Sequence, residues 1–287
     1  MEFQIISFAT ALVGSSLAGL CDLKTTEIPD EIPYAMIAIA LILYGIQSYL
    51  QWSYWPLLNS LIAGLSLLGF GFMMYYLGQW GGGDAKTLSA IGFLIPTSEL
   101  FPELIFPFPF SYLINVFLIG AAYMLIYAFV LSLINRKIIS KFVKDLKSTS
   151  NVLLVGSVFL FVFLVGINWY LINFFQTRFD LVLILRSSIF PVIATLGLFA
   201  IWKFARSVED VGFKRTIPIS KLKVGDVLEQ NKLWEGITEK ELIKIKKSGK
   251  KYVRIKEGVR FAPAFPLALL FTLYFGDGLF FLIKLLM

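Results

Sequence analysis

The chain has 287 residues, of which 57% are hydrophobic and 16% charged, with a net charge of +7, one cysteine and no histidine. Because about a quarter of the residues in soluble domains are charged, this composition indicates a membrane protein. The missing histidine excludes Ser-His-Asp and Cys-His catalysis and histidine metal ligands, and the single Cys21 excludes an internal disulfide. Any catalysis must therefore use carboxylates, hydroxyls, amines or the backbone.

Eight segments approach the length of about 20 mostly apolar residues that a transmembrane helix needs. We expect spans over residues 3–21, 33–50, 56–78, 85–97, 108–135, 152–175, 181–203 and 263–286. The fourth segment is short, so it is either a tilted helix or half a span.

The positions of Lys and Arg predict the orientation in the membrane. An outside N-terminus places Lys24, Lys86, the cluster at 136–147 and the segment 204–260 inside, whereas the outer loop 98–107 carries no Lys or Arg. We therefore expect a multi-pass protein of the plasma membrane with its N-terminus outside.

Residues 205–260 form a basic segment, with 15 Lys and Arg against 8 Asp and Glu. We expect a small cytoplasmic α/β unit here, with short strands over 216–219 and 252–255 and a helix capped by Thr238 and Glu241. Two interpretations of its charge stay open. It could attract anionic lipids of the inner leaflet, or it could be a solvated face that only enforces topology.

The expected fold is therefore an all-α polytopic membrane protein of about eight transmembrane helices, with a small cytoplasmic α/β segment before the last helix. Residues 1–204 would hold the first seven helices, residues 205–260 the cytoplasmic segment, and residues 261–287 the last helix. Charged residues at the membrane edge of such a fold are costly and each needs a reason.

Two aspartates fall at the same, cytoplasmic, edge. Asp22 ends the first helix, where the helix dipole disfavours a carboxylate anion, whereas Asp84 begins a helix, where the dipole favours one. The preceding Gly81-Gly82-Gly83 allows close approach of the backbone. One neutral and one anionic carboxyl are what an aspartyl protease needs to polarise a carbonyl and activate water. The structural alternative is a helix cap at Asp84 and a solvated loop residue at Asp22.

A carboxylate pair in a membrane also suits a transporter or channel that binds a cation or relays protons. Transporters more often show repeated halves with broken helices in matching positions, and the sequence shows no such repeat. A scaffold subunit of a membrane assembly would leave the two aspartates without a purpose.

Three short motifs lie near the ends of the expected helices. They are Asp22 followed by Ile-Pro-Asp at 28–30, G-x-G-D-x-K at 81–86 and F-x-P-x-x-x-x-A at 261–268. With these motifs and the basic segment before the last helix, the chain resembles the type IV prepilin and archaeal preflagellin peptidases. These enzymes are the GxGD class of membrane aspartyl proteases.

The resemblance implies an endopeptidase that cuts the leader of pilin and archaellin precursors at the cytoplasmic face of the membrane. Such precursors, the implied partners, carry a short basic stretch before the cut and a hydrophobic helix after it. The implied site residues are the catalytic Asp22 and Asp84, the loop-shaping Gly81, Gly82 and Gly83, and the candidate substrate contacts Glu27, Asp30 and Glu31. The last three could equally form a solvated acidic loop.

We expect no cofactor, no metal and no nucleic-acid partner. Bacterial relatives that also methylate the new N-terminus carry two CxxC pairs in an enlarged loop after the first helix. This chain has a short loop there and only Cys21, so zinc and methyltransferase activity are unsupported. The large segment before the last helix points to an archaeal-type enzyme.

Overall fold

A computed structural model describes residues 2–97, 99, 101, 104–175, 180–231, 234, 236–248 and 251–286. The chain forms two compact units. The first comprises Met1–Ile126 and Lys214–Met287, and the second comprises Tyr127–Phe213. This division is based on the packing of the chain. The expected division into membrane helices and a cytoplasmic segment depends on the position of the bilayer and stays a prediction.

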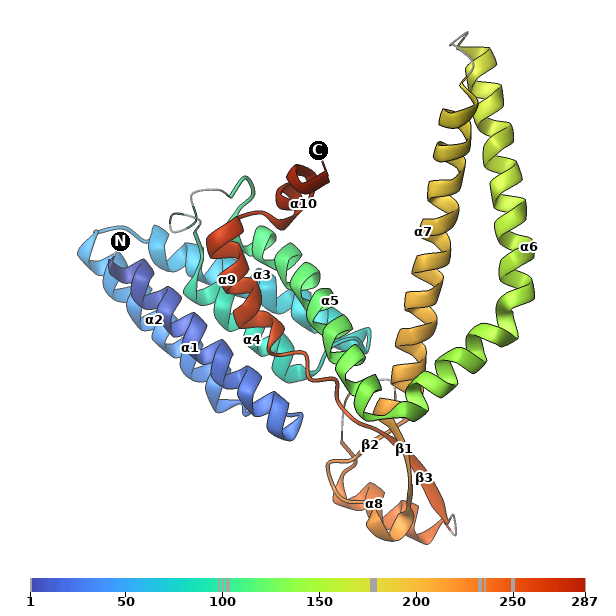
Figure 1. Ribbon diagram of the computed structural model, residues 1–287. Helices are drawn as coiled ribbons and strands as arrows, with labels where there is room; N and C mark the ends of the chain where they lie inside the picture. Colours follow the sequence, from blue (N-terminus) through green and yellow to red (C-terminus); the bar gives the residue numbers. More distant parts are fainter. Residues whose placement is uncertain are drawn as a thin grey trace. The chain divides into compact units, whose positions relative to one another are not determined.

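The first unit is mainly a bundle of apolar helices (Figure 1). In chain order these are α1 (Glu2–Thr25), α2 (Glu31–Leu50), α3 (Trp55–Tyr76), α4 (Gly82–Leu94), α5 (Phe108–Ile134), α9 (Ala264–Phe275) and α10 (Gly278–Leu286). The last part of α5, from Tyr127, belongs to the second unit. Helix α4 has 13 residues and is therefore only about 20 Å long. Nine of its residues are buried, so α4 lies inside the bundle, where it packs mainly against α2 and α3.

Small residues let α3 and α4 approach closely, as is common between membrane helices. A Cβ placed on Gly71 would lie 2.8 Å from the Ala85 Cα atom, and one on Gly92 would lie 2.9 Å from the Ala63 carbonyl oxygen. At the C-terminal end of α4, the Tyr44 hydroxyl donates to the Leu94 carbonyl over 2.7 Å. The packing and this hydrogen bond fix the helix that follows the glycine loop.

Six helices among the described residues are long and apolar enough to cross a membrane, and the number rises to seven if the bent pair α9–α10 counts as one span. The helical membrane protein expected from the sequence is therefore supported, but the expected count of about eight spans is not confirmed. The segment 85–97 lies largely within the short helix α4, and the segment 263–286 is two helices bent by 56° rather than one.

The bend between α9 and α10 is held by a buried polar network. Gly276 has a φ of 67°, a conformation that glycine adopts at little cost. The Asn115 amide group donates to the Thr272 hydroxyl and to the Gly276 carbonyl, each over 2.9 Å, and its oxygen accepts from the Gly278 N–H over 2.8 Å. The Asp277 carboxylate accepts from the backbone of the 104–107 loop. The break therefore has partners for the backbone groups that it frees.

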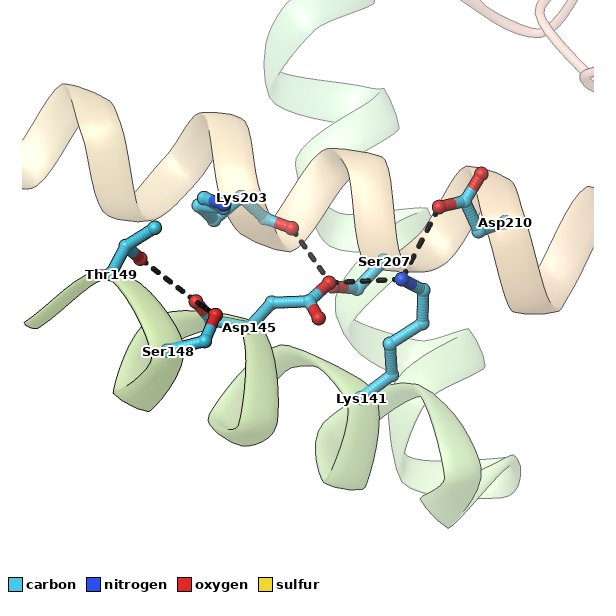
Figure 2. A network of polar contacts seen from close by, with 7 residues as sticks. All are labelled: Lys141, Asp145, Ser148, Thr149, Lys203, Ser207 and Asp210. Atoms are coloured by element: carbon cyan, nitrogen blue, oxygen red, sulfur yellow. Dashed lines mark hydrogen bonds and ion pairs between the residues drawn. The ribbon is translucent and has the colours of Figure 1, made fainter.

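The second unit contains α6 (Arg136–Phe174), α7 (Leu181–Val208) and the π-helical turn η1 (Glu209–Phe213). Figure 2 shows how Lys141 joins them: its ammonium group lies 2.9 Å from the Asp145 carboxylate and 3.3 Å from that of Asp210. Helix α6 begins at Arg136, well before the span expected over 152–175. Lys and Arg favour helix, but only the apolar part of this helix was recognised as a span from hydropathy.

The α/β segment, residues 214–260, contains the strands β1 (Lys214–Pro218), β2 (Val227–Leu228) and β3 (Tyr252–Lys256) and the helix α8 (Glu239–Lys247). The antiparallel sheet has the order β1-β3-β2. Its small core is built from Leu222, Leu228, Ile237 and Ile255.

The capping box predicted for this segment is present at the start of α8. The hydroxyl of Thr238 accepts from the Glu241 N–H, and the Glu241 carboxylate accepts from the Thr238 N–H over 2.8 Å. The backbone N–H and then the hydroxyl of Thr238 hold the pKa of the exposed Glu241 side chain below its usual value. Both predicted strands are also found, whereas the two-residue β2 was not predicted.

Candidate active site

A cavity of about 790 Å³ lies in the first unit, where the end of α1, the loop between α3 and α4, and the α/β segment meet. Asp22 and Asp84 both line this cavity, together with Gly81, Gly82 and Gly83. The two carboxyl groups are close enough for their charges to interact. The structure therefore brings together the two aspartates and the glycine loop that the motifs single out.

Asp22 lies in the last turn of α1, and only 5% of its surface is exposed. One carboxylate oxygen accepts a hydrogen bond from the backbone N–H of Ala262 over 2.9 Å. The Arg260 guanidinium is near enough to interact electrostatically with the same carboxylate. Gly19, one turn earlier, leaves room for Pro263: a Cβ there would lie 3.2 Å from the Pro263 Cα atom. The F-x-P motif thus supplies both a packing partner and a hydrogen-bond donor to α1.

Asp84 occupies the third position of α4, after the N-cap Gly81. Its carboxylate accepts from the Gly81 N–H over 3.1 Å, which satisfies one of the unpaired donors at a helix start. Gly83 faces Ile28: a Cβ at this position would lie 2.9 Å from the Ile28 Cβ atom. Asp84 therefore stabilises the helix start, although from the third helical position and not as the N-cap of the structural alternative, and it lines the cavity as well.

The three acidic residues after α1 lie in different surroundings. Glu27 lines the cavity with the two aspartates. Asp30 instead forms an ion pair with Lys86 over 2.7 Å, which ties the loop to α4. Glu31 begins α2 and lines a separate apolar groove of about 520 Å³ between α1 and α2. Of the three candidate substrate contacts, only Glu27 shares the cavity.

Sequence reasoning missed the part of the cavity that the α/β segment contributes. Trp234 lines the cavity, and its indole N–H donates to the Gly78 carbonyl over 3.0 Å. The Lys256 ammonium lies 4.3 Å from the centroid of the Trp234 ring. A lone tryptophan within the basic segment 205–260 was the only signal in the sequence for this contact.

Within the described part of the chain, no group of three or more Cys, Asp or Glu side chains is arranged as metal ligands would be. Among the residues that line the cavity are Asp22, Asp84 and Arg260, and the Asp22 carboxyl is held by the N–H of Ala262. Such a set can position and activate a water molecule beside a peptide carbonyl.

Comparison with known proteins finds similarity over part of the chain. Residues 9–135 match the sequence model of the type IV leader peptidase family. Prepilin peptidase EppA of Methanothermobacter thermautotrophicus is 25% identical over 159 residues, which cover 51% of this chain and 41% of that protein. The preflagellin peptidase of Methanocaldococcus jannaschii is 33% identical over 92 residues, 32% of this chain and 39% of the relative. That of Methanococcus voltae is 34% identical over 98 residues, 34% of this chain and 41% of the relative.

The fold and the cavity define a helical membrane protein with a pair of carboxyl groups at its helix ends. The matched region, 9–135, contains Asp22, Asp84 and the glycine loop, and over this region the chain is similar to the type IV leader peptidase family. The predicted resemblance to the type IV prepilin and preflagellin peptidases is thus confirmed. The matched relatives are named as peptidases, so the transporter alternative finds no support among them. The chain spans about two fifths of the length of the curated relatives that it matches.

Proposed function

We propose that this protein is a membrane aspartyl endopeptidase that removes the short basic leader of prepilin- or preflagellin-like precursors. The observation that carries the proposal is the shared cavity of Asp22 and Asp84. The names of the relatives, prepilin peptidase and preflagellin peptidase, support the substrate class. The family match over 9–135 supports the use of this cavity, because both aspartates lie inside the matched region.

In the proposed mechanism the two carboxyls share one proton. The anionic carboxylate takes a proton from water as the water oxygen attacks the scissile carbonyl carbon, and the neutral carboxyl gives its proton to the carbonyl oxygen. The tetrahedral gem-diol then collapses: the C–N bond breaks, the leaving nitrogen takes the proton that the first carboxyl received from water, and one hydroxyl of the gem-diol returns its proton to the other carboxylate. Because the two groups interact, the two roles belong to the pair rather than to one residue.

The proposal places the cavity at the cytoplasmic face and the N-terminus outside. Support comes from the basic residues Lys24 and Lys86 and the basic stretch 136–147, since cytoplasmic loops are enriched in Lys and Arg. The lipid bilayer is the second proposed partner. For the α/β segment this includes anionic lipids of the inner leaflet.

The test is cleavage of a precursor co-expressed in membranes. Asp22→Asn and Asp84→Asn keep side-chain shape but remove acid–base function, so each should lower cleavage at least about 100-fold. Asp180→Asn is a matched control, because Asp180 caps α7 in the second unit and Asn is an equally good cap. Cleavage that survives either of the first two substitutions would refute the dyad.

A further inference from the structure

The α/β segment completes the cavity of the two aspartates. Its contribution, called here the segment wall, consists of residues 223–227, Trp234, Gly236 and 255–260. We propose that the segment wall binds the leader of the precursor on its way to Asp22 and Asp84. This inference rests on the proposed function and adds the site that would hold the leader before the cut.

Three contacts join the segment wall to the elements that carry the aspartates. The Trp234 indole donates to the carbonyl of Gly78, just before the glycine loop. Gly258 lies beside Thr26, which follows α1: a Cβ on Gly258 would be 3.4 Å from the Thr26 carbonyl oxygen. The chain then runs directly from the wall to Ala262, whose N–H binds Asp22. The segment wall is therefore part of the cavity that contains the two aspartates.

The geometry of such a substrate explains why its leader would meet this wall. The hydrophobic helix after the cut lies in the bilayer, and the polar leader before the cut cannot enter it. With the scissile bond at Asp22 and Asp84, the leader must leave the aspartates on the side away from the membrane helices. That side of the cavity is lined by the α/β segment.

The cavity is lined by basic side chains, those of Lys24, Lys223, Lys256 and Arg260, and also by acidic ones that can bind basic side chains of an extended peptide. Glu27 faces the cavity from the end of α1, and its carboxylate forms no ion pair with any described residue. Glu257, on the segment wall, pairs with Arg215 over 3.0 Å. Arg215 is largely exposed, so this pair is weak and can exchange for a pair with the leader. Asp226 adds a third carboxylate at the cavity.

Trp234 gives the wall an aromatic surface for a basic side chain. Lys256 already lies over its ring at 4.3 Å, which shows that the ring face accepts a cation. We expect a lysine or arginine of the leader to compete for this face, and carboxylates Glu27 and Glu257 to hold the adjacent charge.

A first experiment maps the contact directly. The full-length Asp84→Asn chain in membranes is incubated with a precursor that carries a photoreactive residue in its leader, and the cross-linked peptide is identified by mass spectrometry. Cross-links in 223–227 or 255–260 are expected. Cross-links confined to other parts of the chain would overturn the inference, while the dyad would still be tested separately by cleavage.

A second experiment uses Trp234→Ala, with Tyr252→Ala as the matched control. Tyr252 is an exposed aromatic residue on β3 that does not line the cavity. For the full-length leader, Trp234→Ala should raise KM about tenfold at nearly unchanged kcat, as expected for a lost cation–π contact. For a precursor whose leader is cut back to the residue before the cleavage site, wild type and Trp234→Ala should have similar KM values.

The two proposals fail in distinguishable ways. If Asp22→Asn or Asp84→Asn still cleaves the precursor, the proposed function is wrong. If cleavage needs both aspartates but Trp234→Ala raises KM equally for the full and shortened leaders, only the leader site is wrong. An equal effect of Tyr252→Ala would likewise show that Trp234 acts through the stability of the segment.

Discussion

The backbone N–H of Ala262 donates to the carboxylate of Asp22 over 2.9 Å, although 240 positions separate the two residues in the sequence. The contact is buried, and it joins the end of the first helix to the residue two positions before α9. The first and last parts of the chain therefore meet at the candidate catalytic carboxyl.

This contact predicts different outcomes for two substitutions of Asp22. In Asp22→Asn the side-chain oxygen still accepts from Ala262, so the protein should keep nearly its normal stability while it loses cleavage. Asp22→Ala leaves the buried N–H of Ala262 unpaired, which should lower the free energy of unfolding by about 1–3 kcal/mol. Thermal unfolding in one detergent measures both variants. Equal destabilisation by Asn and Ala would show that the hydrogen bond contributes little.

The glycine loop predicts a sharp difference between neighbouring positions. A Cβ at Gly83 would lie 2.9 Å from the Ile28 Cβ atom, whereas one at Gly82 would meet only the Tyr75 ring at 4.0 Å. Gly83→Ala should therefore cost about 1–3 kcal/mol of stability through overpacking, and Gly82→Ala should cost less than 1 kcal/mol. Unfolding measurements on the two variants check this, and similar stabilities would mean that the Ile28 loop yields without cost.

The network at the break of the last helix predicts a large loss of stability for Asn115→Leu. This change would leave the Gly276 carbonyl and the Gly278 N–H without partners in a buried site, at about 1–3 kcal/mol for each group. Asn173→Leu is the control, because the exposed Asn173 side chain bonds only within its own helix, to Trp169. Thermal unfolding should separate the two variants clearly. A stable Asn115→Leu protein would mean that water or a rearranged backbone replaces the amide.

Cysteine labelling tests the orientation of the first unit. In a Cys21→Ala background, Tyr252→Cys places a thiol on β3, and Gln51→Cys places one after α2. If the N-terminus is outside, a membrane-impermeant maleimide should label Gln51→Cys in intact cells and Tyr252→Cys only after permeabilisation. The reverse pattern would invert the topology and move the aspartates to the outer face.

The elements with local signals could be predicted from the sequence. The strands around 216–219 and 252–255 and the capping box of Thr238 and Glu241 are all present. Strand β2 could not be predicted, since it has two residues and exists only through its pairing with β3.

The helix boundaries show where hydropathy fails. Apolar windows detect the membrane part of α6 but not its charged beginning at Arg136. They also merge α9 and α10, because two glycines and Asp277 hardly lower the mean hydropathy of a long apolar stretch. The break depends on Asn115 of α5, and the sequence around residues 276–278 gives no sign of a partner so distant in the chain.

The candidate site was predictable where motifs mark it. Asp22 and Asp84 were singled out by motif and helix position, and the structure places them at one cavity, although their catalytic role stays a prediction. The Ala262 donor and Trp234 were not predicted, because a backbone N–H has no sequence signature and the Trp234–Gly78 contact forms only in the tertiary structure.

The depth at which α4 is buried has a consequence for how the protein responds to its lipids. Helices that face lipid tilt or shift when the bilayer becomes thicker or thinner. From Thr87 to Leu94, α4 is buried without interruption, so its neighbours are protein rather than acyl chains. Changes in lipid chain length can therefore reach Asp84 only through the helices around it. The position of the helix that carries this carboxyl therefore does not depend directly on the thickness of the membrane.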